Sequence, residues 1–175
     1  MKTVTINIYQ FSELSDEAKE NAIKRLYDIN VDSDWWDNTY EDAAQINLKI
    51  KGFDIDRGSY VNAEFIESAN NTAELIIMNH GESCETYKTA KSFLQDYNEL
   101  VAKYSDGVKT DRVTEDNEYD FDNESDDLEN DFLQSISEDY RIILSNEYDY
   151  LTSEKSIIET IEANEYDFTE YGQLK

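Results

Sequence analysis

The side chains best suited to covalent chemistry are His80 and Cys84, the one histidine and the one cysteine of the sequence, four residues apart. A cysteine thiolate with a histidine as its general base forms a nucleophilic pair. The surrounding stretch favours a plainer interpretation, a histidine at a helix end before Gly81 and a partly buried cysteine. The sequence contains no GxSxG, GxxxxGK[ST] or GxGxxG motif. We therefore expect a protein that is not an enzyme, with no catalytic residue and no cofactor.

Two short acidic stretches, at 54–58 and 120–124, resemble the start of a calcium-binding loop. An EF-hand loop requires glycine at its sixth position and a bidentate glutamate at its twelfth. Neither stretch has these residues at those positions. One cysteine and one histidine are too few for a zinc cluster. The sequence predicts no specific metal site, and loose binding of divalent cations by clustered acids stays open.

Carboxylates dominate the chain, with 41 Asp and Glu against 15 Lys and Arg and a net charge of -26. Residues 111–131 contain eleven acids and one base. Where such a block is extended, alternate side chains lie about 7 Å apart, which resembles the phosphate spacing of a nucleic-acid strand. The alternative is a solvated segment that only adds solubility. The candidate partner-binding acids are Glu115, Asp116, Glu118, Asp120, Asp122, Glu124, Asp126, Asp127, Glu129 and Asp131.

The sign of the net charge limits the partners of this protein. A strongly negative field repels nucleic acid and anionic membranes, so direct nucleic-acid binding and membrane binding are not expected. The same field attracts basic surfaces, above all the nucleic-acid-binding grooves of other proteins. The chain starts without the pattern of a signal peptide and has no apolar run of about 18 residues. We expect it in the cytoplasm of a bacterial host.

Hydrophobic periodicity predicts the elements that carry these groups. Alternation in residues 3–11 indicates a strand, and a stripe of apolar residues behind the cap Ser15 indicates a helix to about residue 30. A second helix is expected over 32–47. Alternation on both sides of a turn at 56–59 then indicates a hairpin, in which Leu48, Ile50, Phe53 and Ile55 pair with Tyr60, Val61, Ala63 and Phe65.

The remaining chain reads as mainly helical. Helices are expected over 69–79, 84–104, 126–150 and 153–164. Apolar residues that include Ile76 and Phe93 mark the buried sides of the first two, and Ser153 is the expected cap of the last. A short edge strand is expected near the end. The predicted fold is α+β: a small antiparallel sheet of three or four strands with helices packed on one face, followed by an acidic helical C-terminal part. Residues 1–105 carry a net charge of -9 and residues 106–175 one of -17, so the predicted division is a core domain over 1–105 and an acidic segment over 106–175.

Trp35 and Trp36 are candidates for an aromatic anchor, because tryptophan and tyrosine are enriched at interface hot spots. Two adjacent tryptophans cannot both face the core from one helix. At least one is therefore expected at a sheet edge or an interface with a partner, for which a homodimer is one possibility.

Four stretches of the chain resemble small proteins of phages and mobile elements from low-GC bacteria: YQFSELSDEAKENAI, DWWDNTYEDAAQINLKIKGFDIDRGS, NHGESCETYKTAKSFL and NEYDFTEYGQLK. In charge and size the chain is similar to antirestriction and anti-CRISPR proteins that act as nucleic-acid mimics. This second likeness is one of composition, so it implies an acidic interaction surface and assigns a role to no individual residue.

Charge and resemblance together predict an inhibitor of a host defence nuclease. Such an anti-CRISPR or antirestriction protein would act as an acidic nucleic-acid mimic and block DNA or RNA binding by a CRISPR effector or restriction nuclease. The alternative is an acidic adaptor that binds a phage or host protein through an aromatic and helical face. The two differ in salt dependence, because only the first relies on opposite charges.

Overall fold

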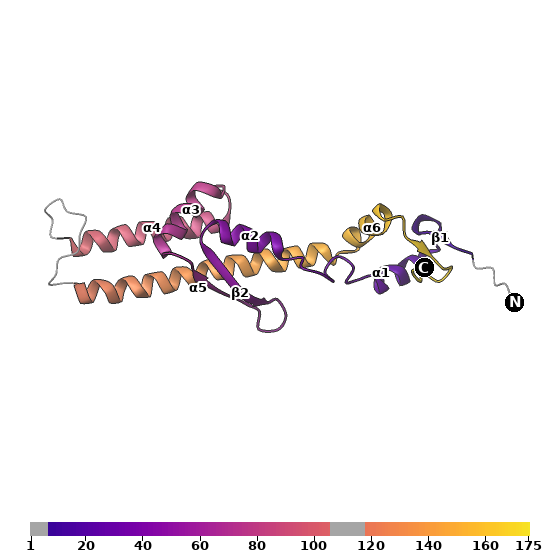
Figure 1. Ribbon diagram of the computed structural model, residues 1–175, viewed down its shortest axis with the longest axis horizontal. Coiled ribbons are helices and arrows are strands. Elements are labelled where there is room, and N and C mark those ends of the chain that lie inside the picture. Colours follow the sequence, from indigo (N-terminus) through magenta and orange to yellow (C-terminus); the bar gives the residue numbers. More distant parts are fainter. Residues whose placement is uncertain (1–6, 106–117) are drawn as a thin grey trace. The chain divides into compact units, whose positions relative to one another are not determined.

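The computed structural model describes residues 7–105 and 118–175 and has an α+β fold (Figure 1). Its sheets are small and antiparallel: β1 pairs with β4, and β2 pairs with β3. The single sheet of three or four strands predicted from the sequence is therefore wrong. The helices are α1 (Asp16–Arg25), α2 (Asp37–Gln45), α3 (Ala69–Asn79), α4 (Glu85–Tyr104), α5 (Glu118–Leu151) and α6 (Glu154–Ala163), and the strands are β1 (Tyr9–Gln10), β2 (Leu48–Asp54), β3 (Tyr60–Phe65) and β4 (Asp167–Phe168).

The chain forms two compact units. The central unit spans Trp36–Leu144, and the terminal unit combines Met1–Trp35 with Ser145–Lys175. Helix α5 contributes residues to both units. Neither unit coincides with residues 1–105 or 106–175, and the domain division expected from composition stays a prediction. As expected, the described part of 106–175 is mainly helical.

The predicted hairpin lies in the central unit. Strands β2 and β3 pair Leu48 with Phe65, Ile50 with Ala63 and Phe53 with Val61, with an irregularity after Ile50. The turn contains Gly58 at a φ of 82°, a conformation that costs glycine little because it has no Cβ. Ile55, expected to pair as well, lies beyond the end of β2.

The core of the central unit is built from this hairpin and from α2, α3, α4 and α5. At its centre the ring of Phe132 stacks on Phe93 at 4.3 Å and on Phe65 at 5.6 Å between centroids. Tyr140 is fully buried, and its hydroxyl donates a hydrogen bond of 2.7 Å to Asp42 Oδ2. The expected helical stripes of α3 and α4 are confirmed, because Ile76 and Phe93 are buried.

The core of the terminal unit joins the two ends of the chain. Tyr9 pairs with Phe168 in the two-residue sheet of β1 and β4. The side chains buried together are Phe11, Leu14, Ala18, Ala22, Ile157, Ile161 and Phe168. Ser15 and Ser153 cap α1 and α6, accepting hydrogen bonds from the backbone N–H groups of Ala18 and Ser156. Both caps were predicted from the sequence.

Four predicted boundaries differ from the structure by several residues. Helix α1 ends at Arg25, about five residues before the expected end. The second helix is α2, which starts at Asp37, five residues later than expected. The first strand covers only Tyr9–Gln10 of the described residues, and positions 1–6 of the prediction lie outside them. Helix α5 starts at Glu118, eight residues before the expected start. Within residues 7–105 and 118–175, no helix is both long and apolar enough to cross a membrane.

Candidate protein-binding surface

Most of the acids predicted to bind a partner lie on α5. Glu115 and Asp116 lie outside the described residues. Glu118 is the first residue of α5, and only its backbone is described. The extended arrangement with a spacing of about 7 Å is therefore wrong from Glu118 onward. The seven acids whose side chains are described are Asp120, Asp122, Glu124, Asp126, Asp127, Glu129 and Asp131.

The first part of α5 is helical despite its charge because an apolar stripe packs it against α4. The ring of Phe121 meets Tyr97 and Tyr104 edge-on, at 6.4 and 5.9 Å between centroids. Further along the helix, Leu128 and Phe132 pack in the core. Acids near a helix N-terminus are also favoured by the helix dipole. Figure 1 shows α4 and this part of α5 running side by side.

The helix sorts its acids into two rows on either side of the apolar stripe. Asp120, Glu124, Asp127 and Asp131, the acidic row, follow each other at intervals of three or four residues and are all exposed. At 1.5 Å per residue these intervals correspond to steps of about 4.5–6 Å along the axis. The second row, with the same intervals, is Asp122, Asp126 and Glu129.

Three acids of the row, Glu124, Asp127 and Asp131, line a groove between α4 and α5 to which α4 adds two more acids. This acidic groove has a volume of about 530 Å³ and is lined by Asp96, Glu99, Leu100, Lys103, Glu124, Asp127, Leu128 and Asp131. Among the described residues, its lining thus has five carboxylates and one base. An adjoining hollow of about 420 Å³ shares Asp96, Leu128 and Asp131 and continues toward Lys88 and Ser135.

The single base of the acidic groove is already paired. Lys103 Nζ donates to both carboxylate oxygens of Glu124 at 2.6 Å, and the Tyr104 hydroxyl donates to Oε1 at 2.8 Å. The hydrogen bonds from Lys103 and Tyr104 lower the pKa of Glu124 and keep it ionised. On the second row, burial and the nearby Asp126 raise the pKa of Glu129. Because Lys103 is paired with Glu124, the described lining of the acidic groove keeps carboxylates in excess of cations.

Sequence reasoning missed Asp96 and Glu99 as members of this surface. Both lie in the helix predicted over 84–104, and their spacing of three residues places them on one face of α4. That spacing could have identified Asp96 and Glu99 from the sequence as two acids on the same side of a helix. The pairing of α4 with the first part of α5 was not predicted, because the predicted helix began only at residue 126.

Trp35 and Trp36 fall into different units. Trp35 lies 5.6 Å from the ring of Tyr148 in the terminal unit, and Trp36 meets Phe53 edge-on at 5.6 Å in the central unit. Both side chains are half-buried against aromatic residues of their own unit. Trp36 directly precedes α2, so the two tryptophans do not share a helix. Their role as an aromatic anchor stays a prediction.

His80 and Cys84 lie at the end of α3 and at the start of α4. His80 Nδ1 lies 2.8 Å from Thr86 Oγ1, and Nε2 lies 3.7 Å from Asp42 Oδ1. Cys84 is the N-cap residue of α4 and is exposed, which corrects the expected partial burial. Asp54 accepts a hydrogen bond of 2.7 Å from the Asp56 backbone N–H, in a turn after β2. The described residues contain no group of three or more His, Cys, Asp or Glu side chains placed to hold a metal ion.

No protein-family model, no curated protein and no solved structure matches this chain. The resemblance to proteins of phages and mobile elements therefore stays a prediction from the sequence.

Proposed function

We propose that the protein is a non-enzymatic inhibitor from a phage or mobile element that occupies the nucleic-acid groove of a host defence nuclease. The target class is a CRISPR effector or restriction nuclease, and the protein acts in the bacterial cytoplasm. The observation that carries the proposal is the acidic row beside the acidic groove, where carboxylates from α4 and α5 gather with one paired base.

The charge density of α5 suits an imitation of nucleic acid. The helix contains twelve Asp and Glu but one base, Arg141, whose guanidinium is paired with Glu138 at 2.6 Å. A single nucleic-acid strand carries one charge per about 3.4 Å, and the acidic row advances by about 4.5–6 Å per charge beside a second row. Arginine and lysine side chains that normally hold phosphates would meet carboxylates at a similar linear density.

The carboxylates are held on a packed helix, which favours tight binding. Phe121, Leu128 and Phe132 fix α5 against the core, so the acidic row needs no ordering of its backbone when a partner binds. A preorganised surface loses less conformational entropy on association than a disordered acidic segment. Opposite charges would also speed the encounter with a basic groove.

The test is a binding assay against a panel of CRISPR effectors and restriction nucleases. We expect a complex with at least one of them that competes with DNA or RNA and weakens steeply between about 50 and 200 mM salt. Substituting the acidic row in the variant D120N/E124Q/D127N/D131N should weaken that complex by about fourfold to nearly a thousandfold, at about 0.2–1 kcal/mol for each of four exposed pairs.

The matched control removes the same four charges from the terminal unit, in D28N/D34N/D149N/E162Q. All four positions are exposed, and the numbers of Asp and Glu replaced are the same as in the acidic row. This control should retain affinity within a few-fold, because only the general field changes. Equal losses in both variants, or binding that is insensitive to salt, would overturn the mimic proposal.

The second candidate is the acidic adaptor that binds through Trp35, Trp36 and a helical face. Its binding would tolerate salt and fail in Trp35→Ala. The same assay separates it from the mimic, because the acidic-row variant would then bind normally. The homodimer stays a prediction, checked by sedimentation of the purified protein.

A further inference from the structure

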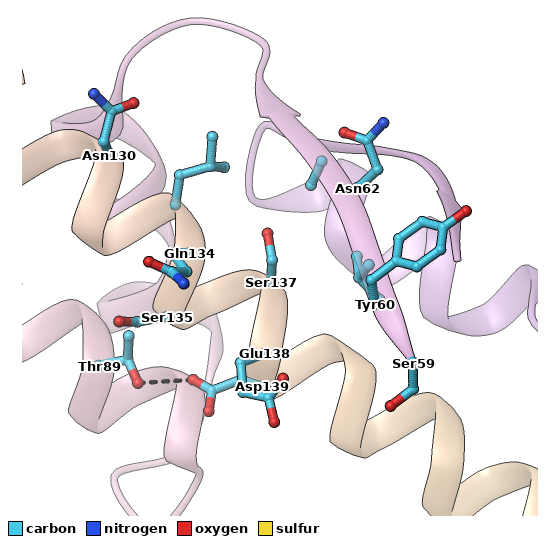
Figure 2. A pocket seen from close by; sticks show the side chains of 13 residues that line it. Ser59, Tyr60, Asn62, Thr89, Asn130, Gln134, Ser135, Ser137, Glu138 and Asp139 are labelled. Carbon is cyan, nitrogen blue, oxygen red and sulfur yellow. Dashed lines mark hydrogen bonds between the residues drawn. The ribbon is translucent and has the colours of Figure 1, made fainter. Parts of the chain in front are cut away.

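A second groove in the central unit lies between β3 and α5, with Thr89 of α4 at one side (Figure 2). Its volume is about 800 Å³, within the range of about 300–1,000 Å³ of ligand-binding pockets. We call it the β3 groove. It does not involve the acidic row, and Asn130, Gln134 and Ser137 form part of its α5 wall.

The strand contributes its edge to this groove. Five consecutive residues, 59–63, line it. Because side chains of a strand point alternately to opposite faces, a cavity on one face would touch only every second residue. Contact with every residue in turn therefore indicates the backbone edge of the strand. In the described part of the chain, β3 pairs with β2 and with no other strand.

The register identifies which backbone groups lie on the open edge. Ile66 N–H donates to Asn47 O at 2.8 Å, and Leu48 pairs with Phe65, so the groups of Ile66 face β2. Antiparallel ladders alternate between residues bonded to the partner and residues turned away from it. Following this alternation back along β3, the N–H and C=O groups of Val61 and Ala63 point away from β2. They are free to pair with an added strand.

The other wall and the ends of the groove suit an extended peptide. Amide and hydroxyl side chains at Asn130, Gln134 and Ser137 recur at intervals of four and three residues on α5, across from β3 (Figure 2). At one end Arg141 Nη1 donates to Ser59 Oγ at 3.3 Å. Past Ala63, the stacked rings of Phe65 and Phe132 bring strand and helix together. Five residues of strand span about 17 Å.

The charge of the lining selects the occupant. Among the described residues that line the groove, Glu138 and Asp139 are the charged ones, and Arg141 lies at its end beside Ser59. Glu138 is already paired with Arg141, whereas Asp139 accepts a hydrogen bond of 2.7 Å from the Thr89 hydroxyl. Burial and the neighbouring Glu85 and Glu138 raise the pKa of Asp139, despite the bond from Thr89. A cation beside Asp139 would relieve this repulsion.

We propose that the β3 groove binds an extended segment of about five residues from a partner protein, which adds a third strand along Val61 and Ala63. A lysine or arginine of that segment lies at Asp139. A second copy of this chain is a poor occupant, because each copy carries a net charge of -26. The proposal does not depend on nuclease inhibition.

The test starts with a displayed library of five randomised residues flanked by glycines, selected on the full-length protein. We expect enrichment of Lys or Arg among β-branched and polar residues. The enriched peptides should bind Asp139→Asn about tenfold more weakly, and binders without a basic residue should be unaffected. The matched control is Asp37→Asn, an exposed acid of α2 that lines neither the β3 groove nor the acidic groove, which should bind as the wild type does.

Backbone pairing is measured by hydrogen exchange of the wild-type protein with the best peptide. The N–H groups of Val61 and Ala63 should become protected, while those of Asn62 and Glu64, already turned toward β2, should change little. Val61→Pro removes one edge donor without touching the ladder and should weaken binding about tenfold or more, since proline is tolerated at such edge positions.

Three outcomes would overturn the proposal: a library without enriched binders, binders that leave Val61 and Ala63 unprotected, or protection of the same groups by self-association of the protein alone. The last outcome would assign the groove to a second copy. If the peptides still bind the D120N/E124Q/D127N/D131N variant, peptide binding by the β3 groove is supported even where the proposed inhibition of a nuclease is disproved.

Discussion

The central and terminal units close their cores by different means. The central unit relies on large side chains, with Phe132 stacked between Phe93 and Phe65. The terminal unit relies on close backbone approach between chain ends, as Gly172, at a φ of 74°, lies against the backbone of Ala18. The first arrangement is sensitive to lost volume and the second to added volume, so opposite kinds of substitution should break them.

The largest effect is expected from Phe132→Ala in the central unit. Removing a fully packed aromatic ring from a core costs about 3–5 kcal/mol, because the cavity refills only in part. Urea unfolding should report this loss, while amide exchange at Ile161 and Phe168 should change less. Tyr119→Ala on the same helix is the control, with an exposed fraction of 80%. An equal loss of protection in both units would contradict the picture of two separate cores.

Gly172→Ala tests the terminal unit in the opposite sense. The added Cβ would overlap the carbonyl oxygen of Ala18, and the positive φ adds strain. We expect a loss of about 3 kcal/mol, seen as fast exchange at Phe168. Gly58→Ala is the matched control, since its φ is 82° but no atom lies within 4 Å of the new Cβ. Similar losses at both glycines would mean that strain alone matters.

A smaller effect is expected from Tyr140→Phe. The hydroxyl donates to Asp42 Oδ2 at 2.7 Å, and burial and this carboxylate raise the pKa of Tyr140 above its ordinary value. Its removal should lower the free energy of unfolding of the central unit by about 1.5–3 kcal/mol, as for hydrogen bonds to charged groups. Chemical denaturation measures it. A wild-type value in the variant would show that water replaces the hydroxyl.

The smallest effect is the pH dependence. Glu129 and Asp139 have raised pKa values, so the folded state binds their protons more tightly and gains stability as pH falls through these raised values toward the ordinary values of 4.5 and 3.8. Glu124 and Glu138 have lowered pKa values, so their stabilisation is lost as pH falls below the ordinary glutamate value of 4.5. The melting temperature of the central unit should therefore rise on mild acidification and fall again at pH values below the ordinary glutamate pKa.

The variant E129Q/D139N should flatten the rise of that profile on mild acidification, because it removes the two carboxyls with raised pKa values. The fall at lower pH should remain. A profile identical to that of the wild type would assign the rise to the general negative charge of the protein.

Local signals in the sequence were sufficient for several elements. Helix α3 was predicted with the bounds that the structure has, and the caps Ser15 and Ser153 were identified from residue type and position. The hairpin register followed from alternation, which places Ile50 opposite Ala63. These features are determined by residues close together in the sequence, and the periodicity of apolar residues reports on such local patterns.

Contacts between distant segments could not be predicted in this way. Tyr9 pairs with Phe168 across almost the whole chain, which turned an expected edge strand into a separate two-residue sheet. The acids of residues 118–125 indicated solvation, whereas packing of Phe121 on Tyr97 and Tyr104 extends the helix through them. The acidic groove depends on that packing, so only its α5 acids could be identified in advance.

The exposed thiol of Cys84 offers a reporter that needs no engineered attachment point. It is the one cysteine of the chain, so a maleimide fluorophore or spin label would attach at a single position in the central unit. Thr89, which lines the β3 groove, follows five residues later, about 7.5 Å along the axis of α4. A label there would read occupancy of this groove in real time, and the terminal unit would contribute no signal.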